Sequence, residues 1–255
     1  MKSTELRSFI EEIKFRNRNP KDNSVLYLLN DLDTNPEIVI DTDTFLFRSR
    51  LVDDTMESDT DKGFYGYDAK NSLAPEPKKT VDGRANYRNI PYLYCSNDEY
   101  ISMIEVRPRF SARVSVVTIA VKEKITLLDF TMQTIPKNMS EEKKTLFYDL
   151  SELFSTPIAN SDDVLEYIPT QYIAEYVKNL PYDGIAFKSS LLTESLGAGK
   201  PLGEINIVVF NHEKCVAKAS NVYKITENYL ECEQVDQDKL RKEIVSPVIK
   251  ALQSV

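Results

Sequence analysis

Hydrophobic and polar positions follow two different periods along this chain. Residues 113–121 alternate polar and apolar side chains, as a half-buried strand does. Residues 184–188 and 205–210 are short apolar runs that are typical of central strands. Residues 5–15 instead place their apolar side chains at helical spacing. Because strands and helices are mixed without a regular strand–helix–strand alternation, the pattern predicts an α+β fold.

The same reading gives the order of the expected elements. The expected strands are 45–50, 91–95, 113–121, 125–130, 184–188, 205–210 and 214–224. The expected helices are 5–15, 25–32, 97–105, one after Ser140, one that begins at Pro169 and a last one capped by Asp236. We therefore expect a helical N-terminal extension (1–40), a main domain (41–225) and a C-terminal helix packed on that domain (226–255).

Residues 53–91 differ from the rest of the chain. They are polar, with glycines, prolines and many aspartates, and show little periodicity. So long a stretch is usually a functional loop or a disordered one. Its scattered aromatic residues, Phe64, Tyr65 and Tyr67, favour an ordered loop.

Composition and charge exclude several classes of function. The formal net charge is −8, whereas a surface for duplex nucleic acid needs a basic face. Three cysteines match no zinc template and favour a reducing cytoplasm, and a lone histidine, His212, gives little support to a Ser-His-Asp triad or a metal site. No apolar run approaches the ~20 residues of a membrane-spanning helix. We therefore expect a cytoplasmic protein without a metal, a membrane segment or a nucleic-acid partner.

Four positions carry candidate chemistry. Arg48 lies inside an apolar strand, where a charge is costly unless a partner compensates it, so it is either a structural ion pair or an anion receptor. Residues 83–86 form a turn in which a glycine lets the backbone approach a ligand. Tyr94 could stack on an aromatic ring of a ligand. Glu105 ends an apolar helix near arginines, which suits a structural ion pair or a catalytic group.

Two hydroxyl groups end a predicted strand further along the chain. Ser189 and Ser190 follow residues 184–188 directly. Hydroxyls at a strand end commonly bond a substrate or cap a turn. Without a histidine nearby they are poor nucleophiles.

Taken together, these residues resemble the RES-domain family, named for an arginine, a glutamate and a serine. The resemblance covers about residues 40–215. Its first motifs are Leu46-Phe47-Arg48-Ser49-Arg50, Gly83-Arg84-Ala85-Asn86, Pro91-Tyr92-Leu93-Tyr94 and Ile104-Glu105-Val106-Arg107-Pro108. Its later motifs are Ile168-Pro169-Thr170-Gln171, Tyr182-Asp183-Gly184-Ile185, Lys188-Ser189-Ser190 and Asn206-Ile207-Val208-Val209-Phe210. The chain departs from the family at Phe47, where a tyrosine is common, at Leu191, where an arginine often follows, and by an insert at 192–203.

The resemblance implies an ADP-ribosyltransferase-like fold, a mixed β core flanked by helices, and an enzyme that consumes NAD as substrate without a further cofactor. The implied catalytic residues are Arg48, Tyr94, Glu105 and Ser189. The implied NAD-binding residues are Arg48, Arg84, Asn86, Tyr94, Ser189 and Ser190. Family members are often bacterial toxins or defence effectors that are held inactive by a helix-turn-helix antitoxin.

Several alternatives stay open at this point. The acceptor of ADP-ribose is water, phosphate or a protein, so the enzyme is a glycohydrolase, a phosphorylase or an ADP-ribosyltransferase. A non-catalytic binding module, with the arginines and Glu105 locked in ion pairs, is a further alternative. The sequence is also compatible with a homo-oligomer and does not determine the oligomeric state.

Overall fold

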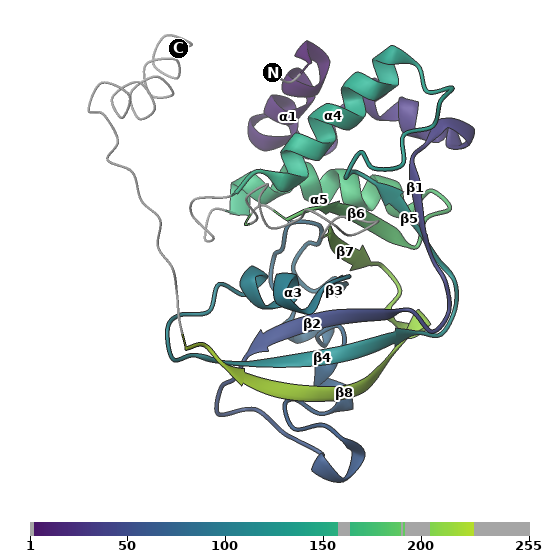
Figure 1. Cartoon of the computed structure of the whole chain (residues 1–255). Helices are drawn as coiled ribbons and strands as arrows, with labels where there is room; N and C mark the ends of the chain where they lie inside the picture. Colours follow the sequence, from purple (N-terminus) through teal and green to yellow (C-terminus); the bar gives the residue numbers. More distant parts are fainter. Residues whose placement is uncertain (1–2, 158–163, 190, 192–204, 227–255) are drawn as a thin grey trace. The chain divides into compact units, whose positions relative to one another are not determined.

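The computed structural model in Figure 1 describes residues 3–157, 164–189, 191 and 205–226. The chain divides into two compact units, residues 1–225 and residues 226–255. The predicted helix capped by Asp236 lies outside the described residues, as does Ser190.

One mixed sheet organises the described part of the chain. Its strands are β1 (Glu37–Ile40), β2 (Phe45–Leu51), β3 (Leu93–Ser96), β4 (Arg113–Val121), β5 (Ile125–Asp129), β6 (Gly184–Lys188), β7 (Ile205–Val209) and β8 (Cys215–Lys224). Their order in space is β1-β5-β6-β7-β3-β2-β4-β8. The β5–β6 pair is parallel and the other neighbouring pairs are antiparallel. With helices beside this sheet, the predicted α+β class is confirmed (Figure 1).

Five α-helices accompany the sheet in the described residues. They are α1 (Thr4–Phe15), α2 (Ala69–Ser72), α3 (Glu99–Glu105), α4 (Glu141–Ser155) and α5 (Val164–Lys178). Short 3₁₀ helices occupy Ser24–Asn30, Leu32–Thr34, Thr60–Lys62, Pro77–Lys79 and His212–Lys214. The region 53–91 is thus an ordered loop with short helical turns, as its aromatic residues indicated.

The central strands are buried on both faces, and successive residues alternate between two hydrophobic clusters. On β7, Val208 belongs to the first hydrophobic cluster, which also contains residues of α1, α4 and α5. Ile207 and Val209 belong to the second hydrophobic cluster, on the other face of the sheet. On β3, Tyr94 packs against the first cluster and Leu93 belongs to the second. The helices therefore cover one face of β3, β6 and β7, as strand periodicity requires.

The N-terminal region differs from a simple helical extension. The predicted helix 25–32 is a 3₁₀ helix, Ser24–Asn30, and residues 37–40 form strand β1, which pairs with β5. Helix α1 buries Leu6, Phe9 and Ile13 in the first cluster. Residues near the N-terminus therefore contribute to the sheet and to its main hydrophobic cluster.

The prediction that a helix begins at Pro169 is wrong. Helix α5 includes Val164 and contains Pro169 in its interior. Proline cannot donate the backbone hydrogen bond of an inner helical position, which normally ends or kinks a helix. Here the apolar stripe formed by Ile173, Ala174 and Val177 packs in the first cluster, and this burial favours the continuous helix.

Two absences follow from the described residues. No helix among them is long and apolar enough to span a membrane. Within the same residues, no group of three or more histidine, cysteine, aspartate or glutamate side chains could hold a metal ion.

The close approach of strand β7 to Gly184 generates a first prediction. A Cβ at Gly184 would lie 2.0 Å from the carbonyl oxygen of Val208 on β7. We expect Gly184→Ala to lower the free energy of unfolding by about 3 kcal/mol, because the backbone of two paired strands must move apart. Urea unfolding measures this loss. Gly63→Ala is the control: it meets no atom within 4 Å but has a φ of 84°, so it should cost about 1 kcal/mol. Equal losses would contradict the prediction.

Candidate active site

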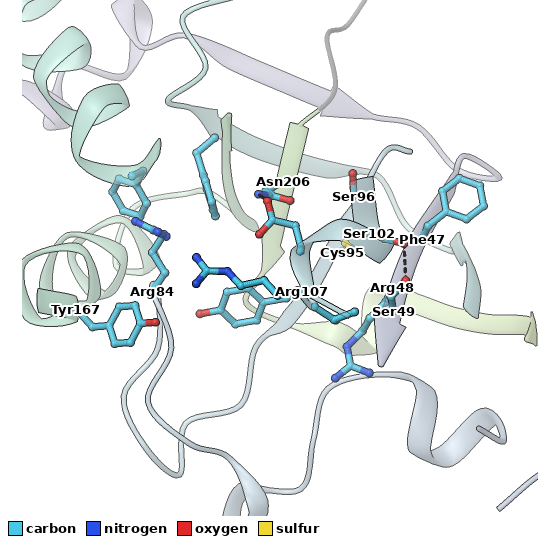
Figure 2. Close-up of a pocket in the computed structure, with 15 residues that line it drawn as sticks. Phe47, Arg48, Ser49, Arg84, Cys95, Ser96, Ser102, Arg107, Tyr167 and Asn206 are labelled. Carbon is cyan, nitrogen blue, oxygen red and sulfur yellow. Dashed lines mark hydrogen bonds between the residues drawn. The ribbon is translucent and has the colours of Figure 1, made fainter. Parts of the chain in front are cut away.

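A cavity of about 440 Å³ lies where α3, the end of α4 and the start of α5 meet strands β2, β3 and β7. Figure 2 shows its lining as sticks. The lining residues are Phe47, Arg48, Ser49, Arg84, Tyr94, Cys95, Ser96, Ser102, Glu105, Val106, Arg107, Phe154, Tyr167, Phe187 and Asn206. Arginines, one carboxylate and aromatic rings therefore share a single cavity, which suits a ligand that combines negative charge with ring systems.

Glu105 is the last residue of α3, and its carboxylate is held from the sheet. Helix α3 begins after Asp98, whose carboxylate accepts from the backbone N–H of Ile101 at 3.1 Å. At the other end, Glu105 Oε1 accepts a hydrogen bond from Ser189 Oγ at 2.5 Å and one from Asn206 Nδ2 at 2.7 Å. In the described part of the chain, Glu105 Oε2 has no hydrogen-bond partner and Glu105 forms no ion pair.

Tyr94 fixes the turn that carries Arg84. The Tyr94 hydroxyl accepts from the backbone N–H of Ala85 at 2.9 Å and donates to Asn86 Oδ1 at 2.8 Å. A Cβ at position 83 would lie 2.8 Å from this hydroxyl, so Gly83 is required by close packing. These two hydrogen bonds hold the turn against β3, and they form without a bound ligand.

A second contact holds the same turn from helix α5. Gln171 is fully buried, and its Nε2 donates to the carbonyl oxygens of Gly83 at 2.9 Å and Asn86 at 2.8 Å. Asn86 is itself buried, and its amide donates to the carbonyls of Val81 and Tyr87. These bonds occupy the Asn86 side chain within the turn, which gives it a structural role.

Burial also controls the protonation of Tyr94. The apolar surroundings raise the pKa of Tyr94 well above its ordinary value, because a phenolate would be desolvated there. The hydroxyl therefore stays protonated at neutral pH and keeps donating to Asn86. The tyrosine ring, which lines the cavity, is the part of the side chain that can contact a ligand.

Two arginines approach the cavity near Glu105. Arg84 donates to the carbonyl oxygens of Leu153 at 3.5 Å and Thr156 at 3.0 Å at the end of α4. Burial lowers the pKa of Arg84, and the negative charge of Glu105 opposes that effect. Arg107 is exposed, and Figure 2 shows it directed, with Arg84 and Tyr167, toward the same space.

Neither of these arginines has an acidic partner in the part of the chain that the structure describes. Among the described residues, no carboxylate lies within ion-pair distance of Arg84 or Arg107. A guanidinium in this state can bind phosphate oxygens through its planar fork of donors.

Arg48 lies apart from the other candidate residues. Its Nη1 donates to the carbonyl oxygen of Ser72 at 3.3 Å, and its guanidinium turns away from Arg84 and Arg107 (Figure 2). Burial, with a smaller effect of the charge of Arg50, lowers the pKa of Arg48 to about 10. No carboxylate among the described residues pairs with Arg48, so these residues provide no support for a structural ion pair at this position.

The structure thus brings together most of the residues that the sequence singled out. Glu105 and Ser189 are in direct contact, and Tyr94 adjoins the turn with Arg84 and Asn86. Arg48 lines the same cavity, but its guanidinium is directed away from Arg84 and Arg107 (Figure 2).

Three residues of this site were not predicted from the sequence. They are Arg107, Asn206 and Tyr167. Arg107 was within the Glu105 motif, and Asn206 is a polar residue in an otherwise apolar strand, which is a signal that could have been used. Tyr167 gave no such signal, because aromatic residues at helical spacing are usually core residues.

Comparisons with known proteins found a matching family model and similar solved structures. A family model described as the RES domain matches residues 60–229, two thirds of the chain. A crystal structure of the M. tuberculosis MbcT-MbcA toxin-antitoxin complex contains a chain with 13% identity and a TM-score of 0.44; the match covers 79% of this chain and 93% of that one. A search of curated proteins found no match. The family match begins at residue 60, so it does not reach Arg48.

The hydroxyl of Tyr94 generates a second prediction. Tyr94→Phe would leave the N–H of Ala85, which is fully buried, without its acceptor. We expect the free energy of unfolding to fall by about 2 kcal/mol, since an unpaired buried donor bears its full desolvation cost.

Denaturant unfolding measures this effect, with Tyr100→Phe as the matched control. The Tyr100 side chain is 53% exposed, so its change should stay within about 0.5 kcal/mol. A Tyr94→Phe protein as stable as the wild type would show that the turn does not depend on this hydroxyl.

Proposed function

The chain belongs to the RES-domain family, and from this membership we propose that it is an NAD-degrading enzyme that cleaves the bond between nicotinamide and ribose. The observation that carries the proposal is the Glu105 carboxylate, which is held by two neutral donors in a cavity lined by arginines. An uncompensated carboxylate is suited to stabilise positive charge in a transition state.

The proposed cleavage needs little from the protein beyond charge and position. The glycosidic bond breaks and its electron pair moves to the pyridinium nitrogen, so nicotinamide leaves as a neutral molecule. Positive charge grows on the ribose, and the Glu105 carboxylate stabilises this oxocarbenium-like state. Water or phosphate then adds to the anomeric carbon, and the proton of the acceptor is released.

The arginines provide the proposed anion site for the pyrophosphate of NAD. Arg84 and Arg107 line the same cavity as Glu105. Neither of them has an acidic partner among the described residues. Arg48 belongs to the site by family resemblance and lines the cavity at another point. The ring of Tyr94 provides a surface on which nicotinamide could stack.

The binding-module alternative is less well supported. It requires the arginines and Glu105 to be locked in ion pairs. In the described part of the chain, Arg48, Arg84, Arg107 and Glu105 form none. For the half-buried side chains of Arg48, Arg84 and Glu105, a charge without such a partner is a cost to folding, which favours a ligand that compensates it.

A toxin role and a helix-turn-helix antitoxin partner complete the proposal. They rest on family resemblance, in which such enzymes are often paired with an inhibitor. ADP-ribose transfer to a protein remains the alternative activity. The acceptor is therefore determined from the products, because free ADP-ribose, its phosphorylated form and a labelled protein are different species.

Replacing the carboxylate tests the proposal. Glu105→Gln keeps an oxygen that can accept from Ser189 and Asn206 but removes the charge. We expect nicotinamide release to fall by about 100-fold or more, while the Kd for NAD changes by less than about threefold. Chromatography of the products with and without phosphate, and calorimetry for binding, give the two values. Equal losses of turnover and binding would count against this role of Glu105.

Arg107 provides an independent test of the anion site. Arg107 is exposed, and its side chain forms no ion pair among the described residues, so Arg107→Ala should leave the Tm unchanged. The Kd for NAD should rise by about 10-fold, the value of one charge-assisted hydrogen bond.

Arg109→Ala is the matched control for that experiment. Arg109 is also exposed, lies two residues along the chain and does not line the cavity. A similar rise in Kd for both variants would indicate a general effect of positive charge rather than a specific contact of Arg107.

A further inference from the structure

Asn206 is a polar residue in the apolar strand β7, and it meets the candidate catalytic carboxylate. The neighbours of Asn206 on the strand, Ile205 and Ile207, are buried in the second hydrophobic cluster. Asn206 itself lines the cavity, and its Nδ2 donates to Glu105 Oε1 at 2.7 Å. A polar side chain in such a strand requires a partner, and in the described residues the acceptor for this amide is Glu105.

We propose that Asn206 is a positioning residue that acts through Glu105 and, with Ser189, fixes the orientation and preserves the charge of its carboxylate. This inference rests on the proposed NAD cleavage and deepens it. Asn206 does not take part in bond making or breaking. Its role is to hold the group that stabilises the charged ribose.

The geometry explains how two side chains can fix one carboxylate. Ser189 follows strand β6, and Asn206 lies on the neighbouring strand β7, where it is in register with Phe187 of β6. Both donors reach the same oxygen, Oε1, at 2.5 Å and 2.7 Å. Two bonds to one oxygen restrict rotation of the carboxylate and leave Oε2 without a partner among the described residues. A catalytic group that is held in this way does not need to reorganise during the reaction.

The chemical type of the donors matters as much as their position. A hydroxyl and an amide are neutral, so they hold the carboxylate without cancelling its charge. A lysine or arginine in the same place would form an ion pair and weaken the attraction for a developing oxocarbenium ion. Arg84, the arginine that acts on Glu105 electrostatically, lies beyond ion-pair distance. The arginines of the site thus remain available to bind the anionic part of the substrate.

A direct contact of Asn206 with the substrate is the main competing role. Such a contact would contribute to NAD binding and would act independently of Glu105. A positioning role instead depends on the carboxylate and disappears when the carboxylate is absent. A double-mutant cycle between the two residues separates these roles.

The experiment combines Asn206→Leu with Glu105→Gln in the full chain. Leucine keeps the approximate size of asparagine in an apolar strand but cannot donate a hydrogen bond. We expect Asn206→Leu alone to lower kcat for nicotinamide release by about 10–100-fold, with the Kd for NAD changed by less than about threefold. In the Glu105→Gln background, adding Asn206→Leu should lower kcat by less than about twofold.

Two further variants control for the stability of strand β7. Asn206→Ala should reproduce the non-additive loss, so the result does not depend on how leucine packs. Val208→Ala lies on the same strand and the same face in the first hydrophobic cluster. It should lower the Tm but leave kcat near the wild-type value, because Val208 does not line the cavity.

The outcomes separate this inference from the proposed function. No nicotinamide release from the folded wild-type protein would overturn the proposed function and, with it, this role of Asn206. Release by the wild type with additive losses in the cycle, with a raised Kd and unchanged kcat, or with no effect of either Asn206 variant would overturn the positioning role alone.

Discussion

Strands β3, β6 and β7 are covered on both faces by hydrophobic clusters, so each polar side chain on or beside them needs a partner within the protein. The partners that the structure provides form the candidate site. Tyr94 bonds the turn of Ala85 and Asn86, while Ser189 and Asn206 bond Glu105. The same hydrogen bonds therefore satisfy these polar groups and position the side chains that line the cavity.

The distribution of charge follows a related logic. The chain is acidic, with a formal net charge of −8, yet its cavity is lined by arginines without acidic partners among the described residues. Burial lowers the pKa of Arg48 and Arg84, which shows that each bears a desolvation cost. An anionic ligand would offset part of that desolvation cost when it binds beside these arginines. Neutral donors on Glu105, in contrast, keep a negative charge available beside these cations.

Much of the site could be predicted from the sequence, because its polar residues interrupt the hydrophobic pattern of strands and helices. Arg48 stands out in an apolar strand, Glu105 at the end of an apolar helix, and Ser189 at the end of a strand. The family resemblance then joined these separate signals in one order along the chain. Arg107 and Asn206 lie within the same motifs, and Asn206 also interrupts an apolar strand, but the residues that they meet in space are distant in sequence or not indicated by local spacing. Their importance depends on the space that they share with residues distant in sequence.

The sequence by itself determined the α+β class, the positions of most strands and the helix that ends at Glu105, because these follow from local periodicity and capping. Tertiary structure decided the rest. It placed β1 in the sheet, continued α5 through Pro169 and turned Arg48 away from Arg84. The physical reason is the same in each case: burial against distant elements outweighs local preference, and the partner of a buried polar group is fixed only when the strands pair.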